Sequence, residues 1–520
     1  MYNKPESLRR MGVSRLKNDS ELVIGIVQAV GTDSSGVLQD IEEELSGRYL
    51  YRVNKVKVSQ DVLGMFDDGE YEPGSEYDRI WHYIGMGNSV RESTGDNAIL
   101  MRGVAANIHS LRLHHASAGD VEPLGRVAHI VDSIKHPEEI DFLRETYGDG
   151  FHLIGIFDSR VERLSNLRER KRMSDEQANE LLECDEGEAT SYGQHTRDAF
   201  QEADYFLTVT NDVAFRRANV GRLLELLFGN PFITPTFGEY AMFRAYVASL
   251  RSADLSRQIG AVVTRDDEVL AEGANDCAKY GGGLYWQKYD RDKKEYCDGE
   301  EGRDYTLGYD PNKKVQAELI GNILSALGCD SNEENIDRVK NAGVGLLTEY
   351  GRVVHGEMEA LMMCARNGIS TVGCVMYMTT FPCHNCAKHI IAAGIKKVVY
   401  IEPYPKSRAL EFHTAEVTQD RDDDDSKVLF IPFYGVGPHR FADLFAMKST
   451  RWDKRKRKNK NGAIVHWDDS EASLRNPIIG VDYLAREEAA YLTFSTVLDH
   501  YARVEEDVRS EGDQHERKSL

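Results

Sequence analysis

The sequence lacks any run of about 18 uninterrupted apolar residues, the length that a membrane-spanning helix requires. The stretch MYNKPESLRRMGVSRLKND at residues 1–19 carries basic residues with no apolar segment behind them, so we expect no secretory signal and a cytoplasmic location. Cysteine is sparse, with 8 in 520 residues. In a reducing compartment, a C-x-x-C pair is more often a metal or redox site than a disulfide.

Positive charge is also in deficit, because 64 lysines and arginines face 86 acidic residues, a net charge of −22. Sequence-independent affinity for nucleic acid comes from cations that neutralise phosphates, so this balance favours a small-molecule substrate. One basic run, RWDKRKRKNKNG at 451–462, follows the acidic run DRDDDD at 420–425. Solvated loops are the simplest interpretation of both runs.

The length of 520 residues is too great for one ordinary core, and apolar strands alternate with helical patterns in two regions. We therefore predict two α/β domains, at 20–235 and 236–500. Residues 276–350 show little periodicity and are expected to form an insertion in the second domain. Residues 501–520 are predicted to be a disordered tail.

The chemistry is concentrated in two short motifs of the second domain. TTFPCHNCAKHI places Cys383 and Cys386 two residues apart after a proline, and HGEMEA places His355 and Glu357 at the start of a predicted helix. H-x-E followed by P-C-x-x-C is the signature of zinc-dependent deaminases. One imidazole and two thiolates hold Zn²⁺ and leave its fourth position open, and the glutamate moves protons. The motifs predict a catalytic zinc site.

Other uses of the cysteines remain open. A structural zinc knuckle would take its fourth ligand from Cys364 or Cys374, and a thioredoxin-like redox pair would need no upstream H-x-E. A second, structural zinc would use Cys277 or Cys297. His384 lies between the two motif cysteines, and we expect it to point away or pack beside the site.

Longer strings carry a resemblance. RSADLSRQIGAVV, EGAN, HGEMEA, TTFPCHNCAKHIIAAGIKKVVYIEPYPKS and FIPFYGVGPHRFADLF resemble the deoxycytidylate deaminase family over residues 236–450. With VDSIKHPEEIDFLRETYG upstream, nearly the whole chain resembles the bacterial two-domain dCTP deaminases of anti-phage defence. The resemblance implies an N-terminal P-loop kinase-like parallel α/β domain and a C-terminal α/β/α cytidine-deaminase-like domain.

The same resemblance implies roles for residues near the motifs. Asn275 is expected to contact the deoxyribose, and Thr379, Thr380 and Phe381 to line the base pocket. Tyr404 would stack on the base or sugar. Lys406 and Ser407 are candidate phosphate contacts, because an anionic tail needs cationic or N–H donors. The family commonly has H-A-E followed by Asn; here Gly356 and Glu359 stand instead.

The first domain offers QAVGTDSS, residues 28–35, where a P-loop would lie between strand and helix. Against G-x-x-x-x-G-K-[ST], Gln28 replaces the first glycine, Asp33 the second and Ser34 the lysine. Gly31, Ser34 and Ser35 are the residues of this turn that could contact a nucleotide. Asp132 resembles a Walker B acid, and SRVERLSNLRER resembles the lid helix of nucleoside monophosphate kinases. A degenerate kinase fold kept for nucleotide sensing, regulation or assembly is the prediction, and a plain scaffold is its alternative.

The leading functional hypothesis is zinc-dependent hydrolytic deamination of free deoxycytidine nucleotides, dCTP and also dCMP or dCDP, to deoxyuridine nucleotides. The resemblance implies depletion of the dCTP pool during phage infection, restraint by an inhibitory RNA that the run at 451–460 could contact, and a homo-oligomer. A polynucleotide deaminase acting on tRNA or single-stranded DNA is one alternative, and it would need a basic groove with stacking aromatics. A catalytically silent nucleotide sensor is the other.

Overall fold

The structure is a computed structural model that describes residues 19–67, 74–115, 121–186, 192–299, 301–404, 407–420, 426–448, 455–478 and 481–519. The chain divides into two compact units, and each of them is an α/β unit. The first unit consists of Met1–Pro235 with Tyr434–Leu520, and the second of Thr236–Phe433. In the part of the chain that is described, no helix is long and apolar enough to cross a membrane.

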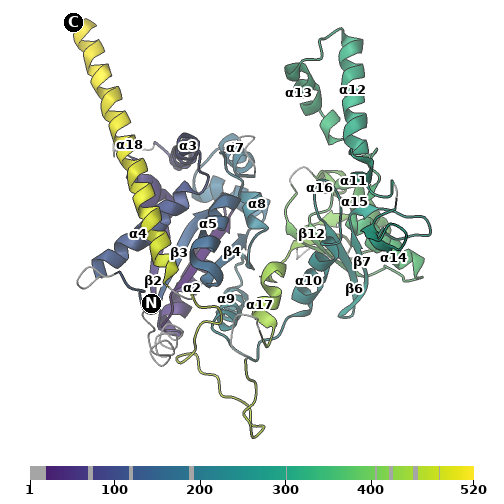
Figure 1. The fold of residues 1–520 in the computed structure, drawn as a ribbon, viewed down its shortest axis with the longest axis horizontal. Coiled ribbons are helices and arrows are strands. Elements are labelled where there is room, and N and C mark those ends of the chain that lie inside the picture. The colour runs from purple at the N-terminus through teal and green to yellow at the C-terminus, as the bar shows by residue number, and fades with distance from the viewer. Residues whose placement is uncertain are drawn as a thin grey trace. The chain divides into compact units, whose positions relative to one another are not determined.

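The first unit is built on a six-stranded sheet in the order β16-β5-β4-β1-β3-β2 (Figure 1). All neighbouring pairs are parallel except β16 with β5. Every residue of β1 before Gln28 is buried, because helices cover both faces of a parallel sheet. The strands are β1 (Leu22–Gln28), β2 (Arg52–Lys57), β3 (Val127–Ile134), β4 (Phe151–Phe157), β5 (Tyr205–Thr208) and β16 (Gly435–Val436).

The helices of this unit follow amphipathic patterns and end at recognisable caps. α5 begins with a capping box from His136 and Glu139, and α3 ends at Gly95 in the left-handed conformation. Residues from α2 and α9 form one core with alternate residues of β1. The helices are α2 (Ser35–Gly47), α3 (Glu76–Thr94), α4 (Ile99–His115), α5 (Pro137–Tyr147), α6 (Arg160–Ser165), α7 (Asp175–Glu186), α8 (Thr196–Phe200), α9 (Val213–Leu227), α17 (Phe441–Phe445) and α18 (Asp482–Ser519).

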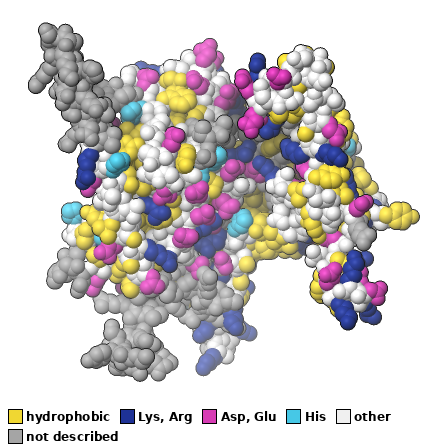
Figure 2. All heavy atoms as spheres, turned by 45° about the horizontal axis from the view of Figure 1, so that its top comes forward, with side chains coloured by type: hydrophobic (Ala, Val, Ile, Leu, Met, Phe, Trp, Pro, Cys, Tyr) yellow, Lys and Arg dark blue, Asp and Glu magenta, His cyan; other side chains and the backbone are white. Residues whose placement is uncertain are grey.

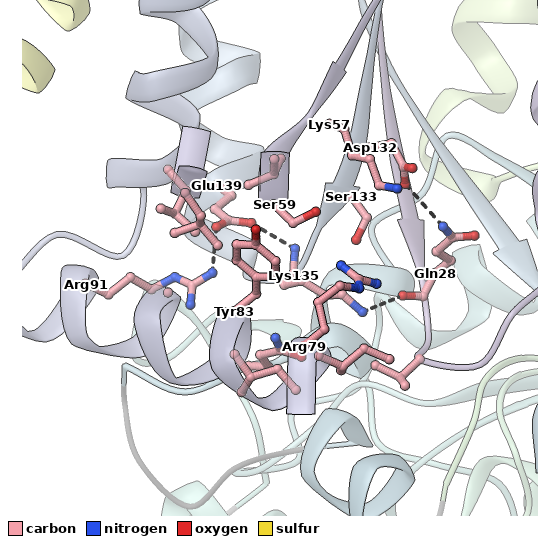
Figure 3. A pocket seen from close by; sticks show the side chains of 18 residues that line it. Gln28, Lys57, Ser59, Arg79, Tyr83, Arg91, Asp132, Ser133, Lys135 and Glu139 are labelled. Carbon is pink, nitrogen blue, oxygen red and sulfur yellow. Dashed lines mark hydrogen bonds and ion pairs between the residues drawn. The ribbon is translucent and has the colours of Figure 1, made fainter. Parts of the chain in front are cut away.

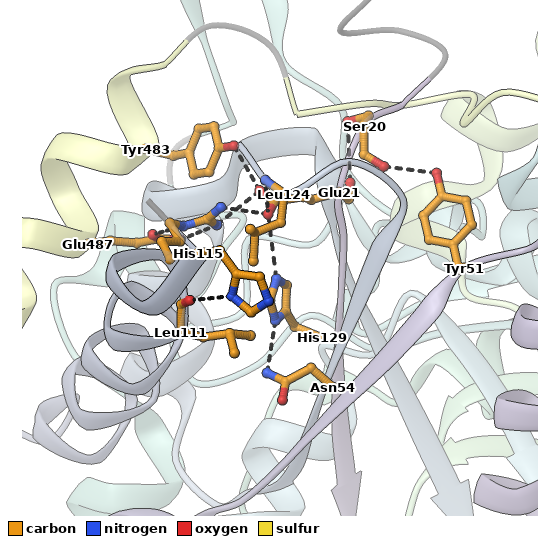
Figure 4. A network of polar contacts seen from close by, with 11 residues as sticks. Ser20, Glu21, Tyr51, Asn54, Leu111, His115, Leu124, His129, Tyr483 and Glu487 are labelled. Atoms are coloured by element: carbon orange, nitrogen blue, oxygen red, sulfur yellow. Dashed lines mark hydrogen bonds and ion pairs between the residues drawn. The ribbon is translucent and has the colours of Figure 1, made fainter. Parts of the chain in front are cut away.

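The C-terminal segment belongs to the first unit, although the sequence analysis assigned residues up to 500 to the second domain. β16 pairs with β5, and α18 packs along α4 (Figure 1). A buried network fixes α18 there (Figure 4). In this network, Arg112 of α4 contacts Glu21 at 2.5 Å and Glu487 of α18 at 2.6 Å. The Tyr483 hydroxyl donates a hydrogen bond to Glu21 at 2.7 Å.

The predicted disordered tail at 501–520 is helical as far as Ser519, where α18 ends. That prediction rested on the terminal position of the segment, since chain ends are often poorly ordered. Glutamate, arginine and glutamine are strong helix formers, however, and a helix that is already packed at its start needs no further nucleation to extend.

The second unit also has a six-stranded mixed sheet, in the order β14-β15-β13-β12-β6-β7. β6 and β7 form a hairpin, and Asp266 and Asp267 in its turn both have positive φ, as a two-residue type I′ turn requires. The remaining strands run parallel to β12. The strands are β6 (Gly260–Arg265), β7 (Glu268–Ala274), β12 (Val375–Thr380), β13 (Lys397–Glu402), β14 (Val417–Thr418) and β15 (Val428–Pro432). The two mainly parallel α/β sheets confirm the predicted fold class.

Helices α10 (Phe237–Ser249), α14 (Gly356–Arg366) and α15 (His384–Ala392) pack on this sheet and its neighbours. The expected insertion at 276–350 has more regular structure than its sequence suggested. It begins with β8 (Asp276–Cys277), which pairs with β11 (Val353–Val354), and it continues with the hairpin β9 (Lys288–Asp290) and β10 (Glu295–Cys297). It also forms α11 (Asp304–Leu307) and a helical arm of α12 (Pro311–Leu327) and α13 (Glu333–Asn341) (Figure 1).

Candidate metal centre

Two helix starts bring the signature residues together. His355 is the N-cap residue of α14, directly after β11, and Cys383 is the N-cap residue of α15, just after β12. Cys386 lies in the first turn of α15 and is buried. The free N–H groups and dipole at a helix start favour the thiolate over the thiol.

The donor atoms of these residues converge on one point. The His355 Nδ1 lies 3.2 Å from the Cys386 Sγ and 3.5 Å from the Cys383 Sγ. The three ligand atoms lie within 4.8 Å of one another, and they form the single group of at least three metal-ligating side chains found among the described residues. One nitrogen and two sulfurs suit zinc, and three protein ligands leave a fourth position for catalysis.

Charge within the cluster is divided unequally between the two sulfurs. The hydrogen bond from Cys386 and the contact with His355 hold the pKa of the Cys383 thiol at about 4, far below its usual value. The same pairing raises the pKa of Cys386, and the Cys383 contact raises the pKa of His355 to about 9. A lowered pKa favours the thiolate of Cys383, the form that binds a metal.

Glu357 lies in the first turn of α14, two residues after His355. Its side chain is only 3% exposed, and its Oε2 is buried without a hydrogen-bond partner. Burial raises the pKa of its carboxyl group, and the nearby His355 opposes that shift. A buried carboxyl oxygen with no partner is costly unless a ligand or water pairs with it, so this orphaned atom fits a substrate or water position beside the three ligands.

Two glycines explain how α14 approaches the sheet so closely. A Cβ on Gly273 of β7 would lie 2.2 Å from the Gly356 carbonyl oxygen. A Cβ on Gly356 would lie 2.9 Å from the Ile259 carbonyl oxygen. Gly356, which departs from the H-A-E pattern, thus allows the backbone before β6 to contact the helix start that carries His355 and Glu357.

Residues 235–402 match the family described as "Cytidine and deoxycytidylate deaminase zinc-binding region". The deoxycytidylate deaminase of Enterobacteria phage T4 is 29% identical over 164 residues, covering 32% of this chain and 77% of that protein. The Homo sapiens deoxycytidylate deaminase is 34% identical over 99 residues, covering 18% of this chain and 54% of that protein. This region of the chain is homologous to deoxycytidylate deaminases, which are hydrolases. Its zinc-binding deaminase region contains the His355, Cys383 and Cys386 cluster.

Among solved structures, a gluconokinase from Sinorhizobium meliloti 1021 matches with a TM-score of 0.23 and 14% identity, covering 41% of this chain and 98% of that chain. At this TM-score, the likeness supports no argument about function.

The predicted sugar contact, Asn275, is 5% exposed and already engaged by backbone. Its Oδ1 accepts from the Ile259 N–H at 2.7 Å, and its Nδ2 donates to the Arg257 carbonyl at 2.7 Å. An amide has one further donor and one further lone pair, so a ligand contact remains chemically available. The Thr379 hydroxyl accepts from the Gly260 N–H at 3.2 Å, which ties the end of β12 to the start of β6.

Three more predicted contacts have structural roles of their own. The Thr380 hydroxyl donates to Glu402 at 2.9 Å, and the Phe381 ring packs edge-on against Tyr400 in the core. The Ser407 hydroxyl donates to the Pro382 carbonyl at 2.7 Å. These bonds hold the segment between β12 and the C-x-x-C motif in place.

The remaining predicted positions differ in what the structure describes. Tyr404 is half-buried at the edge of the core, with the Arg257 guanidinium 5.9 Å from its ring centroid. Lys406 lies outside the described residues. His384 is absent from the metal-ligand group, and its ring lies edge-on to Phe412 at 5.9 Å.

Sequence reasoning missed the pair of Arg257 and Glu402. The Arg257 guanidinium donates to the buried Glu402 carboxylate at 3.0 Å. Glu402 ends β13 in the string VVYIEPY, where an acid after an apolar strand was the available signal. Glu359, which stands where the family commonly has Asn, is buried and forms an ion pair with Arg366 at 2.6 Å.

The other cysteines do not join a metal group within the described chain. Cys364 and Cys374 are buried in the hydrophobic core of the second unit. The Cys277 thiol donates to Asp304 at 3.4 Å, and burial raises its pKa to about 11. The Cys297 sulfur lies 4.0 Å from Asp290.

In the turn between β1 and α2, backbone and side-chain groups form hydrogen bonds and an ion pair with other residues of the first unit. The Val30 N–H donates to the buried Asp185 carboxylate at 2.7 Å, and Asn166 donates to the Gly31 carbonyl at 2.7 Å. Ser35 donates to Asp33 at 2.6 Å, and Asp33 also pairs with Arg170. Ser34 precedes α2 without a side-chain cap bond.

Proposed function

We propose that the protein is a zinc-dependent hydrolase that deaminates free deoxycytidine nucleotides. The observation that carries this proposal is the convergence of His355, Cys383 and Cys386 beside the orphaned carboxyl oxygen of Glu357. The homology of this region to deoxycytidylate deaminases supports it.

Each residue has a defined task in the reaction. Zinc, when bound by the three ligands, supplies an activated water at neutral pH. Glu357 would accept a proton from the attacking water and deliver it to ring nitrogen N3 of the cytosine. It would then take the second proton from the hydroxyl newly bonded to C4 and pass it to the amino group, which leaves as ammonia when the C4–N bond breaks. Water and the deoxycytidine nucleotide thus give the deoxyuridine nucleotide and ammonia. Burial of Glu357 keeps bulk water away from that proton transfer.

Substrate contacts are proposed from position. Asn275 would bind the deoxyribose hydroxyl, since it anchors the backbone before β6 beside the helix start of His355. Thr379, Thr380 and Phe381 lead from β12 toward Cys383 and would shape the base pocket. Tyr404, Lys406 and Ser407 follow β13, the neighbouring parallel strand, and are proposed for the sugar and phosphate end.

A free nucleotide is favoured over a polynucleotide. The net charge is −22. The face drawn in Figure 2 also shows acidic and basic side chains interspersed rather than one extended basic surface. We propose dCTP as well as dCMP among the substrates, with depletion of the dCTP pool as an anti-phage function. Restraint by an inhibitory RNA and assembly into a homo-oligomer belong to the same proposal.

The test is ammonia release by the zinc-replete full chain from dCTP, dCDP, dCMP, CTP and a single-stranded oligonucleotide. Glu357→Gln should keep its zinc and lose turnover by about 10²- to 10⁴-fold, the usual contribution of a general acid–base group. Glu359→Gln, a buried acid on the same helix, is the matched control and should retain turnover.

Each outcome is decisive for one part of the proposal. Release from deoxycytidine nucleotides that Glu357→Gln abolishes supports the reaction, and the rates rank the phosphate forms. Release only from the oligonucleotide would replace the substrate class. Full turnover in Glu357→Gln would refute the role of that residue. No release from any compound by RNA-free, zinc-loaded protein would favour a silent sensor.

A further inference from the structure

Two features lie outside the metal centre, a cavity in the first unit and a helical arm on the second. The cavity, of about 230 Å³, is lined by Lys57 and Asp132, which are neighbours across β2 and β3 (Figure 3). Gln28 donates to Asp132 at 3.2 Å, and Arg91 pairs with Glu139 at 2.9 Å. Charges of both signs therefore balance one another in the cavity. In the arm, by contrast, several charged side chains have no partner of opposite charge among the described residues.

The arm is a hairpin of α12 and α13 that extends away from the sheet of the second unit (Figure 1). The two helices pack mainly against each other and against a short helical turn at Val344–Leu346. α13 contains no buried residue, and α12 contains three, Gln316, Ile320 and Leu324. Helices in proteins draw most of their stability from tertiary packing, so this hairpin has a small core for its length.

α12 carries a second apolar stripe beside its buried residues. Val315, Leu319 and Ile323 recur every four residues and are partly exposed. Leu327 continues the series at the far end of the helix and is 69% exposed. At 3.6 residues per turn, this stripe lies next to the buried row, so the apolar face of α12 is wider than α13 covers. A face of this width is typical of a helix in a bundle, which packs against more than one neighbour.

The order of residues in the stripe is symmetric about its midpoint at Gly321. In an antiparallel pair of α12 helices from two copies of the chain, Val315 would lie opposite the partner's Leu327. Leu319 would lie opposite the partner's Ile323 in the same way. A two-fold axis brings one surface patch against an identical patch, and a stripe that matches itself in reverse satisfies this condition.

The charges of the arm have the same reversed symmetry. Glu333 and Glu334 lie at the tip, in the first turn of α13, and Lys313 and Lys314 lie at the base, in the first turn of α12. None of these four side chains forms an ion pair with another described residue. The acid beside the lysines, Asp310, caps α12 by accepting from backbone N–H groups. An antiparallel pair therefore attracts at both ends, whereas a parallel pair would bring like charges together.

We propose that the arm is an interface with a second copy of this chain, in which two antiparallel arms pair about a two-fold axis as a four-helix bundle. This surface and its orientation are additional to the homo-oligomer proposed above, which specified neither. The three metal ligands lie outside the arm, so the pairing does not depend on the deaminase reaction.

The test reverses the charges of the arm in the zinc-replete full chain. Lys313→Glu/Lys314→Glu makes the base acidic, and Glu333→Lys/Glu334→Lys makes the tip basic. Each double variant alone opposes like charges at both ends, so the particle mass in analytical ultracentrifugation should fall to half that of the wild type. An equal mixture of the two should restore the wild-type mass, because each base then meets a tip of opposite charge.

Two controls separate pairing from folding. Lys293→Glu/Lys294→Glu, in the turn of the β9–β10 hairpin of the same insertion, changes the charge equally and should keep the wild-type mass. Zinc content at the wild-type level in every variant shows that the second unit remains folded.

Leu319→Gln provides a variant that changes no charge. The interface would then bury an amide without a partner, so the dissociation constant of the paired arms should rise at least about tenfold. Ala317→Gln, at an exposed position of α12 away from the stripe, is the matched control and should leave the constant unchanged. If the charge variants lose zinc, this pair of variants decides the test.

Halved mass in each charge variant, with recovery in the mixture, supports the proposal. An unchanged mass in both variants, or no recovery on mixing, would overturn it, as would equal effects of Leu319→Gln and Ala317→Gln. A wild type that sediments as a monomer at every concentration would also overturn it, and would leave the arm to a partner of another sequence.

Discussion

The two units each place a strand-to-helix junction where a ligand could bind, and they use it in opposite ways. In the second unit, β12 leads into α15, and the sulfurs of Cys383 and Cys386 converge with His355 as one group of metal-ligating atoms. In the first unit, β1 leads into α2, and the N–H of Val30 is taken by the carboxylate of Asp185. The β12–α15 junction carries ligands for a metal ion, whereas the β1–α2 junction pairs with a carboxylate of the protein itself.

The difference teaches what a spaced motif can reveal. The zinc ligands act on something outside the chain, so their types and spacing are visible as a pattern in the sequence. The acid that closes the first junction comes from α7, 155 residues beyond Val30. No residue near 28–35 indicates in the sequence that Asp185 contacts this junction. A degenerate P-loop motif therefore indicates that the residues typical of phosphate binding are missing. It does not indicate which group of the protein pairs with the backbone there instead.

The largest effect is expected at the β12–α15 junction. Cys383→Ser removes one of three zinc ligands, so zinc content should fall well below one ion per chain. Turnover should fall by more than about 100-fold, because even the loss of a group behind a ligand costs about 10- to 100-fold. Metal analysis and ammonia release measure the two effects. Cys329→Ser, an exposed cysteine, is the control, and full zinc occupancy in Cys383→Ser would contradict the site.

The next effect concerns the segment that returns to the first unit. Arg112→Met leaves Glu21 and Glu487 buried without their shared cation, which should lower the free energy of unfolding of the first unit by about 3–5 kcal/mol. Urea unfolding measures this loss, and zinc content reports whether the second unit is intact. Arg102→Met on the same helix breaks a partly exposed pair with Asp96 and should cost about 1 kcal/mol or less. Equal losses would contradict the importance of burial.

Much of the fold could be predicted from local patterns. The apolar runs became β1, β3, β4 and β5, and the two charged residues between apolar stretches became the turn of the β6–β7 hairpin. The H-x-E and C-x-x-C residues converge as their signature requires. These features depend on periodicity and spacing within about 40 residues, which the sequence displays directly.

Long-range pairing could not be predicted in the same way. The return of β16 to β5 depends on two residues in each strand, too few for a pattern. The role of Glu487 depends on Arg112, 375 residues earlier. The cavity at Lys57 combines residues from several strands and helices whose order in the sheet is not encoded locally. Long-range contacts of this kind determine which polar residues of a helix have a buried partner.

Removal of the Asp185 carboxylate from the β1–α2 junction tests whether it takes the place of a bound anion. Asp185→Ala removes the acid partner of Lys135, whose ammonium keeps its hydrogen bond to the Gln28 carbonyl, and leaves the Val30 N–H without its acceptor. The change should cost about 2–3 kcal/mol, since Lys135 is partly exposed. Inorganic phosphate should then restore part of the lost stability by binding the vacated donors, whereas chloride at equal ionic strength should not. Asp175→Ala on the same helix removes only a surface pair and is the control. Equal destabilisation by both changes, or no rescue by phosphate, would show that Asp185 does not stand in for an anion.

The smallest expected effect concerns the close packing of Gly356, at the start of α14, against the backbone before β6. Gly356→Ala should raise the intrinsic stability of α14 by up to about 1 kcal/mol, because alanine is the better helix former. The new Cβ would lie 2.9 Å from the Ile259 carbonyl, a backbone atom that cannot rotate away. Crowding of this kind costs about 1–3 kcal/mol, so a net loss of about 1 kcal/mol is expected.

Gly321→Ala in α12 is the matched control, since its Cβ would meet no atom within 4 Å. It should stabilise the second unit by about 0.5–1 kcal/mol. Unfolding in urea compares the two variants, and ammonia release shows whether His355 and Glu357 have shifted with the helix start. Stabilisation by both alanines would mean that the backbone before β6 yields to the new methyl group. The glycine would then be a tolerated alternative to the alanine of H-A-E rather than a requirement of the packing around this metal centre.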